Sequence, residues 1–281
     1  YEEALVEYQK AIDIDLAIHC QEYLEMAMSY FSQGDYENAL VQHQKALQEF
    51  QAFHGQEHPS VADSYHDIGI VYMQQEKYEE ALVQYHRTLE IRTRVLGQDH
   101  PYLAASYNNI GRVYNEQGKY EEALVQYQKA LAIDLAVHGQ DHLDVAASYN
   151  NIGNVYNRQG KYEEALVQYQ KALQVYLAVY GQDNLDVAAS YNNIGIVYRN
   201  QGKYEEALVQ YQKALQVFLA VHGQDHPNVA ASYDNIGIVY DIQGKHEEAL
   251  VQLQKALQVH LAVHGQHHPD VATSYNYIGS V

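Results

Sequence analysis

The sequence predicts an all-α solenoid of stacked antiparallel helix pairs, and three observations support this prediction. A block beginning Tyr-Glu-Glu-Ala-Leu-Val recurs with a period of 42 residues. Within each repeat, apolar residues follow the 3.6-residue period of an amphipathic helix in two separate stretches. Glycine and short polar segments separate these stretches. The copies of the block start at Tyr36, Tyr78, Tyr120, Tyr162, Tyr204 and His246.

The repeat at residues 143–184 illustrates the two predicted helices. Helix A ends at Gly160, because glycine readily supplies the left-handed residue that closes a helix. Helix B begins at Tyr162 and runs to about Tyr180, with acidic residues in its first turn where the helix dipole favours them. The predicted core residues are Val145, Tyr149, Ile152, Gly153 and Tyr156 in helix A, and Tyr162, Ala165, Leu166, Tyr169, Ala172, Leu173 and Leu177 in helix B.

Gly153 lies in the middle of helix A, where glycine costs roughly 1 kcal/mol relative to alanine. We expect a close approach of helix B, through the small residues Ala165 and Ala172, to explain it. The 28 tyrosines of the chain mostly fall on the predicted buried stripes, and we interpret them as packing residues whose hydroxyls reach the rims.

The pattern resembles the tetratricopeptide repeat along the whole chain. The 42-residue period and the Gly-Gln-Asp-His-Pro linker are similar to the longer repeats of kinesin light chains, since the usual repeat has ~34 residues. The resemblance implies a right-handed superhelix whose concave groove binds peptides. It rests on Tyr149, Ile152, Gly153, Tyr156, Ala165, Tyr169 and Ala172.

One junction is irregular, because Tyr1 and Tyr36 are 35 rather than 42 residues apart. Either a linker at residues 19–22 precedes a short helix A, or helix A runs through Cys20. We favour the second alternative, since no glycine or proline interrupts this segment. Tyr23, Met26, Ala27 and Tyr30 would then be core residues. We treat residues 1–281 as one array: helix B of a partial repeat, six helix pairs and a truncated helix A. Because the chain starts and stops within the motif, we expect the natural protein to extend further.

Composition excludes several classes of function. A formal net charge of −19 disfavours nucleic acid and anionic membrane surfaces as partners. Cys20 is the only cysteine, so no intrachain disulfide can form. Neither a signal peptide nor a membrane-spanning segment is recognisable. We therefore expect a soluble cytoplasmic protein.

We expect no catalytic, cofactor or metal site. The Glu-Glu pairs are adjacent on a helix start and cannot face each other across a substrate. Four linkers carry a His-x3-His pair, but no cysteine or close carboxylate completes a defined zinc site. We therefore expect chelators to leave the folding transition unchanged. The four pairs are His54/His58, His138/His142, His222/His226 and His264/His268.

A second stripe on helix A is the candidate binding surface, which the family resemblance places on the concave side. One position is asparagine in four copies, and an amide can both donate to and accept from a peptide backbone. The alternative is that these asparagines brace adjacent helices. The predicted groove residues are Asn109, Arg112, Asn150, Asn151, Asn154, Arg158, Asn193, Ile196, Arg199, Asn235 and Ile238.

Other positions on this stripe change between copies, while the helix-B positions Lys129, Lys171 and Lys213 do not. A fixed frame with a varied groove is typical of a recognition scaffold. Variation within helix B, at Asp134, Tyr176, Phe218 and His260, weakens this inference.

These observations predict a non-enzymatic scaffold that binds a protein or peptide segment. The ligand is expected to carry an acidic residue near Arg112, Arg158 and Arg199. The alternative is a structural array that associates end to end, because terminal repeats without polar caps leave core surface open. In that case Tyr1 of one molecule would pack near Tyr275 of another.

Overall fold

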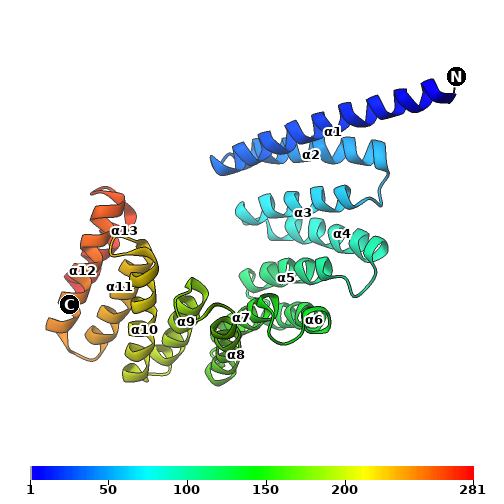
Figure 1. The fold of residues 1–281 in the computed structure, drawn as a ribbon. Coiled ribbons are helices and arrows are strands. Elements are labelled where there is room, and N and C mark those ends of the chain that lie inside the picture. Colours follow the sequence, from blue (N-terminus) through cyan, green and yellow to red (C-terminus); the bar gives the residue numbers. More distant parts are fainter. Residues whose placement is uncertain (1) are drawn as a thin grey trace. The chain divides into compact units, whose positions relative to one another are not determined.

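The computed structural model describes the backbone of residues 2–281 and the side chains of residue 7 and of residues 18–281. Between Glu2 and Ser280 it contains helices joined by short turns (Figure 1), and none of the described helices is long and apolar enough to cross a membrane. The helices are α1 Glu2–Ser32, α2 Tyr36–His54, α3 Pro59–Gln74, α4 Tyr78–Leu96, α5 Pro101–Glu116, α6 Tyr120–His138, α7 Leu143–Arg158, α8 Tyr162–Tyr180, α9 Leu185–Asn200, α10 Tyr204–His222, α11 Pro227–Ile242, α12 His246–His264 and α13 Pro269–Ser280.

The chain forms two compact units, residues 1–137 and 138–281. In both units an odd-numbered helix, the A helix, packs against the even-numbered B helix that follows it, as α3 does on α4 and α9 on α10. The B helix also packs against the next A helix of the same unit, as α8 does on α9. This pairing confirms the all-α repeat architecture. The assignment of both units to one continuous array stays a prediction.

The helices begin and end at the glycines and capping residues of the sequence. Gly160 and Gly181 adopt positive φ values of 73° and 76° after the A and B helices, a conformation that costs glycine little. His142 caps α7, because its Nδ1 accepts a hydrogen bond from the backbone N–H of Asp144 at 3.2 Å. The linker histidine at this position is thus part of the fold.

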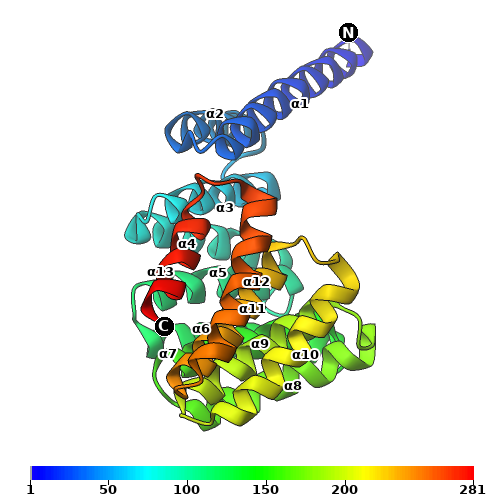
Figure 2. The same cartoon turned by 90° about the vertical axis from the view of Figure 1, so that its left-hand side faces the viewer.

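The first helix corrects one expectation. α1 is a single helix of 31 residues, so helix A runs through Cys20, but no separate helix B precedes it. Its N-terminal half extends past α2 in both views (Figures 1 and 2). Cys20 and Ala27 are buried, whereas Met26 is 44% exposed and is not a core residue. The equivalent Ile194 packs on Ala165 of the preceding pair, and no pair precedes α1 in the described residues.

Four mid-helix glycines are required by a tyrosine ring, which also corrects an expectation. They are Gly69, Gly111, Gly153 and Gly195, whereas Gly237 faces Leu253. A Cβ added at Gly153 would lie 2.8 Å from Cε1 of Tyr169, and one at Gly195 would lie 2.7 Å from Cε1 of Tyr211. Ala165 and Ala172 are fully buried, but the atoms nearest to a Cβ added at Gly153 all belong to Tyr169. In these four pairs the A and B helices therefore meet through a glycine that accommodates an aromatic face.

The hydroxyl groups of these tyrosines differ in their hydrogen bonds. The hydroxyl of Tyr169 donates to Asn154 Oδ1 at 2.7 Å. The buried hydroxyl of Tyr211 has no partner among the described residues, because Ile196 occupies the position equivalent to Asn154. Burial raises the pKa of Tyr211 to about 12, so its hydroxyl stays protonated at neutral pH.

We expect Tyr169→Phe to lower the free energy of unfolding by about 1 kcal/mol, because it removes a satisfied hydrogen bond. The matched change Tyr211→Phe should be neutral or stabilising, since it removes a buried hydroxyl without a partner. Urea denaturation of both variants tests this pair. Equal losses in the two variants would show that the hydrogen bond with Asn154 contributes nothing.

Candidate peptide-binding face

The predicted groove residues lie on one stripe of the A helices, and all are half-buried or exposed. In the first unit, α5 carries two of them. In the second unit, α7, α9 and α11 carry the others. Their distribution is Asn109 and Arg112 on α5; Asn150, Asn151, Asn154 and Arg158 on α7; Asn193, Ile196 and Arg199 on α9; and Asn235 and Ile238 on α11.

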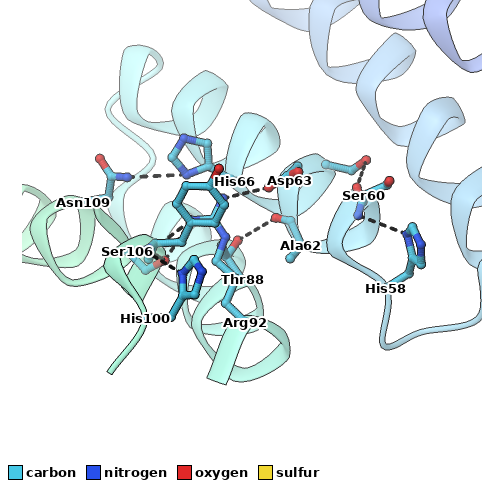
Figure 3. A network of polar contacts seen from close by, with 12 residues as sticks. His58, Ser60, Ala62, Asp63, His66, Thr88, Arg92, His100, Ser106 and Asn109 are labelled. Carbon is cyan, nitrogen blue, oxygen red and sulfur yellow. Dashed lines mark hydrogen bonds and ion pairs between the residues drawn. The ribbon is translucent and has the colours of Figure 1, made fainter. Parts of the chain in front are cut away.

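Two of the recurring asparagines brace neighbouring A helices. Nδ2 of Asn235 on α11 donates to Oδ1 of Asn192 on α9 at 3.0 Å. In the first unit, Nδ2 of Asn109 on α5 lies 3.4 Å from Nδ1 of His66 on α3 (Figure 3). The bracing role is therefore real at these positions. It uses one N–H of each amide and leaves a second N–H for another acceptor.

Three further groove residues also contact the core. Nδ2 of Asn150 is 3.4 Å from the hydroxyl of Tyr176, and Asn154 holds Tyr169 as described above. Ile196 packs on the cluster that contains Tyr211. These side chains position the helix pair, so substituting them changes stability as well as the surface.

A helix-B position reaches this face, which the sequence-based interpretation missed. Phe218 of α10 lines a cleft between α9 and α11, and His260 of α12 lines the equivalent cleft between α11 and α13. The equivalent residue in the first unit, Arg92, contacts Asp63 of α3 and Ser106 of α5. The signal that could have found this position is its variation between copies, which carry Asp134, Tyr176, Phe218 and His260 there.

The cleft between α9 and α11 has a volume of about 350 Å³. Phe218 forms an aromatic wall, and the exposed Ala189 and Ala231 leave the cleft open. Asn192 and Asn193 supply amide groups beside it. An apolar side chain fits this arrangement, flanked by groups that can bind a peptide backbone.

The cleft between α11 and α13 has a similar volume of about 380 Å³ but different chemistry. His260 takes the place of Phe218, and Asp234 takes the place of Asn192. Asp270 stands in the first turn of α13, also at the cleft. The repeat frame is thus the same in both clefts. Phe218 and one carboxylate, Asp186, line the first cleft, whereas a histidine and two carboxylates line the second.

The first unit carries a polar network on the same face (Figure 3). Nη2 of Arg92 donates to Oδ1 of Asp63 at 2.8 Å, and its Nη1 donates to Oγ of Ser106 at 3.0 Å. Burial, and then the charges of Arg92 and Arg112, lower the pKa of His66 to about 4. Burial and the charge of Asp63 raise the pKa of Asp67 to about 6. Both groups are held away from their ordinary protonation equilibria.

The constant helix-B lysines have a structural role. Their constancy therefore no longer supports the contrast between a fixed frame and a varied groove. Lys171 lies over the ring of Tyr149 at 5.0 Å from its centroid, and Lys213 lies over Tyr191 at 5.3 Å. These cation–π contacts join the A and B helices of one pair. The lysines are therefore constrained, and their constancy is no measure of how freely exposed positions vary.

The Glu-Glu pairs likewise contribute more than a helix start. Oε1 of Glu163 accepts hydrogen bonds from Nε2 of Gln201 at 2.9 Å and from Nζ of Lys203 at 3.5 Å. Gln117 and Lys119 contact Glu79 in the same way and lower its pKa. These two Gln-Gly-Lys turns thus tie their own repeats to the preceding B helix.

The linker histidines stack in pairs, with ring centroids 3.6–4.1 Å apart. The expectation that no carboxylate lies close to them is wrong in two repeats. Oδ2 of Asp144 is 3.7 Å from Nε2 of His138, and Oδ2 of Asp270 is 3.6 Å from Nε2 of His264. Each aspartate follows the linker by two residues, and the cap that turns the chain into the A helix brings it back toward the histidines.

The chain consists of helix pairs that are joined by tight turns and recur at a fixed period. Their A-helix face differs in chemistry from repeat to repeat, and these features together define a helical repeat protein. The sequence model of the tetratricopeptide repeat matches residues 21–85, 64–136, 114–178, 144–220 and 186–260. The chain therefore belongs to the tetratricopeptide repeat family, with repeats like those of kinesin light chains. A comparison with curated protein sequences finds no match.

Solved structures share this fold. BtubC from P. vanneervenii is 20% identical, with a TM-score of 0.67 over 90% of this chain and 94% of that one. A putative kinesin light chain of Podospora anserina with nearly identical repeats is 22% identical, with a TM-score of 0.63 over 73% and 98% of the two chains. A STAND protein from Pyrococcus horikoshii with a tetratricopeptide repeat sensor is 20% identical, with a TM-score of 0.71 over 92% of this chain and 38% of that one. These likenesses establish the fold.

Proposed function

We propose that this chain is a non-enzymatic scaffold that binds an extended segment of another protein on the face of its A helices. Tetratricopeptide repeats generally mediate protein–protein interactions, and the observation that carries the proposal here is the pair of clefts in the second unit. Phe218 and His260 occupy equivalent positions in clefts of the same construction. Clefts with the same backbone arrangement but different lining residues can each bind a different side chain of one extended ligand.

The ligand is proposed to place an apolar side chain against Phe218 and an acidic residue near Arg199. Arg199 is half-buried in the last turn of α9, and its charge acts on the buried hydroxyl of Tyr211. Arg158, exposed at the end of α7, acts on Tyr169 in the same way. An acidic group near these arginines would be steered by their charge, which makes association faster at low salt.

A display library of random peptides, selected on the whole chain, tests the proposal. Selected peptides should carry an apolar residue close to an acidic one. We expect Ala189→Arg with Ala231→Arg to weaken their binding by at least tenfold, because both exposed alanines line the Phe218 cleft and the added side chains fill it. Arg158→Glu with Arg199→Glu should slow association and reverse its salt dependence, because an attraction to the acidic residue becomes a repulsion.

Val209→Arg is the matched control, because Val209 is a B-helix residue that is 48% exposed. It should leave binding unchanged. If the cleft-filling variant binds the selected peptides as well as the original chain does, or if Val209→Arg abolishes binding, the A-helix face is not the binding surface.

End-to-end association stays a prediction. Tyr275 on α13 is 56% exposed, and a Cβ at Gly279 would meet nothing within 4 Å, so this A helix offers an uncovered surface. Tyr1, the other proposed contact, lies outside the described residues. Sedimentation over a concentration series, with Tyr275→Lys as the control, distinguishes association through α13 from a monomer.

A further inference from the structure

Three side chains gather where α12 ends and α13 begins. One ring nitrogen of His260, one of His264 and a carboxylate oxygen of Asp270 all lie within 4.8 Å of one another. His260 and His264 are one turn apart on α12, with roughly parallel rings whose centroids are 6.2 Å apart. Nε2 of His264 is 3.6 Å from Oδ2 of Asp270. Two imidazoles at i and i+4 with a nearby carboxylate are a common ligand set for transition metals.

A buried carboxylate orients the first of these rings. Nε2 of His260 lies 3.3 Å from Oδ2 of Asp234 on α11, and the two side chains are 8% and 15% exposed. With the proton on Nε2, the ring donates to Asp234 and its Nδ1 carries a free lone pair. That Nδ1 is buried and has no hydrogen-bond partner in the described part of the chain. A histidine held through one nitrogen by a carboxylate and free at the other is characteristic of metal ligands.

The charges around the cluster favour a cation. Asp234 and Asp270 both line the cleft between α11 and α13, beside His260. The chain as a whole has a formal charge of −19. Two carboxylates that repel each other beside a partly buried imidazole are stabilised by a bound divalent ion.

We propose that His260, His264 and Asp270 bind a divalent transition-metal ion of the class of Zn²⁺, with Asp234 as a positioning residue for His260. Water completes the coordination, because three protein ligands leave at least one position of a tetrahedral ion open. His268 does not belong to this group of side chains, and its Nδ1 accepts the backbone N–H of Asp270 and caps α13. The ion would add stability by binding the folded state. A chelator should therefore lower the stability of the metal-loaded chain, contrary to the expectation drawn from the sequence, while helix packing still folds the chain without the ion.

The neighbouring repeat supplies a natural negative control. His222 and His226 stack at 3.6 Å like the other pairs. However, Phe218, Asn192 and Asn228 stand at the positions of His260, Asp234 and Asp270. The variant His260→Phe with Asp234→Asn and Asp270→Asn copies this set, so we expect it to fold normally. A second His–Asp group consists of His138, His142 and Asp144. Every protein in the test therefore also carries Asp144→Asn, so that this group does not contribute to metal binding.

The test titrates Zn²⁺ into the metal-free chain by calorimetry and follows Co²⁺ by its visible absorption. We expect one site, lost in the triple variant and unaffected by His222→Ala. Asp234→Asn alone should weaken Zn²⁺ binding by roughly 10–100-fold, the usual effect of removing a carboxylate that orients a ligating histidine. Installing Phe218→His, Asn192→Asp and Asn228→Asp should raise the stoichiometry from one ion to two.

The proposal is overturned if the chain in the Asp144→Asn background binds no Zn²⁺, or if the triple variant binds it equally well. Equal affinity for Mg²⁺ would also overturn it, because Mg²⁺ prefers oxygen ligands and would report only an acidic surface. Circular dichroism of each variant confirms that helix content is unchanged.

Discussion

Gly195→Ala is expected to lower the free energy of unfolding by about 2 kcal/mol, although alanine is the better helix former. The new Cβ would lie 2.7 Å from Cε1 of Tyr211, a ring that is fully buried and cannot move aside. Overpacking of this kind costs ~1–3 kcal/mol, and we take the upper end or more because several ring atoms are in contact. The gain in helix propensity of ~1 kcal/mol offsets only part of this cost. Urea denaturation measures the difference.

Gly279→Ala is the matched control, since Gly279 is at the equivalent position on α13 and its Cβ would meet nothing within 4 Å. We expect this change to be neutral or to stabilise by up to about 1 kcal/mol. The first helix pair offers a rescue, because Ala27 and His43 stand there at the glycine and tyrosine positions. Gly195→Ala with Tyr211→His should therefore recover part of the loss. Equal effects at the two glycines would show that the tyrosine ring is not the cause.

Periodicity predicted the helices because it depends on local chemistry. The apolar spacing, the glycines of positive φ and the capping histidines are each set within a few residues, and α7 and α8 begin and end within about two residues of the predicted positions. α1 was mispredicted for the same reason. The repeat register indicated a helix B followed by a helix A, but nothing local in residues 2–32 ends a helix.

The role of the mid-helix glycine shows what spacing leaves open. A periodic pattern identifies which helix faces are buried, so Gly153, Ala165 and Ala172 were correctly predicted to be buried. It does not say which side chain fills the space between the helices. That depends on the rotamer of Tyr169, whose ring lies across the glycine.

The candidate site was predicted in part. Helix-A periodicity identified the exposed stripe, but it could not show that Phe218 and His260 reach the same face from the B helix. Nor could it bring Asp234 to His260, which is 26 residues away in sequence. Contacts between helices depend on how closely they pack, and in the α11–α12 pair this is set by Gly237 against Leu253 rather than by the residues of the site.

Asp67→Asn is expected to stabilise the chain by roughly 1.5–3 kcal/mol at pH 7, with the gain lost near pH 4. Burial raises the pKa of Asp67 from its ordinary value of 3.8 to about 6. A raised pKa means that the contribution of this carboxyl to stability is fully present below pH 3.8 and is lost as the pH rises through about 6. At pH 7 the fold therefore holds an unfavourably ionised carboxylate. Asparagine, which stands at the equivalent Asn109, Asn151 and Asn193, removes that charge.

His66→Asn should have the opposite pH dependence and is the natural partner of this test. The pKa of His66 is lowered from 6.5 to about 4, so its contribution to stability is present above pH 6.5 and is lost as the pH falls through about 4. Relative to the original chain, His66→Asn should therefore gain roughly 2–3 kcal/mol between pH 7.5 and pH 4. In the original chain the two groups largely offset each other over this range.

Urea denaturation of both single variants and of the double variant, at pH 7.5 and pH 4.0, measures these differences on either side of the isoelectric point of about 5.1. The double variant carries the Asn-Asn pair that stands in α5 and α9. Its free energy of unfolding relative to the original chain should change little between pH 7.5 and pH 4.0, because the effects of the two single changes cancel. A pH-independent effect of Asp67→Asn would mean that this carboxyl titrates in its ordinary range. The burial argument for the polar network in Figure 3 would then be wrong, because the same burial lowers the pKa of His66 beside it.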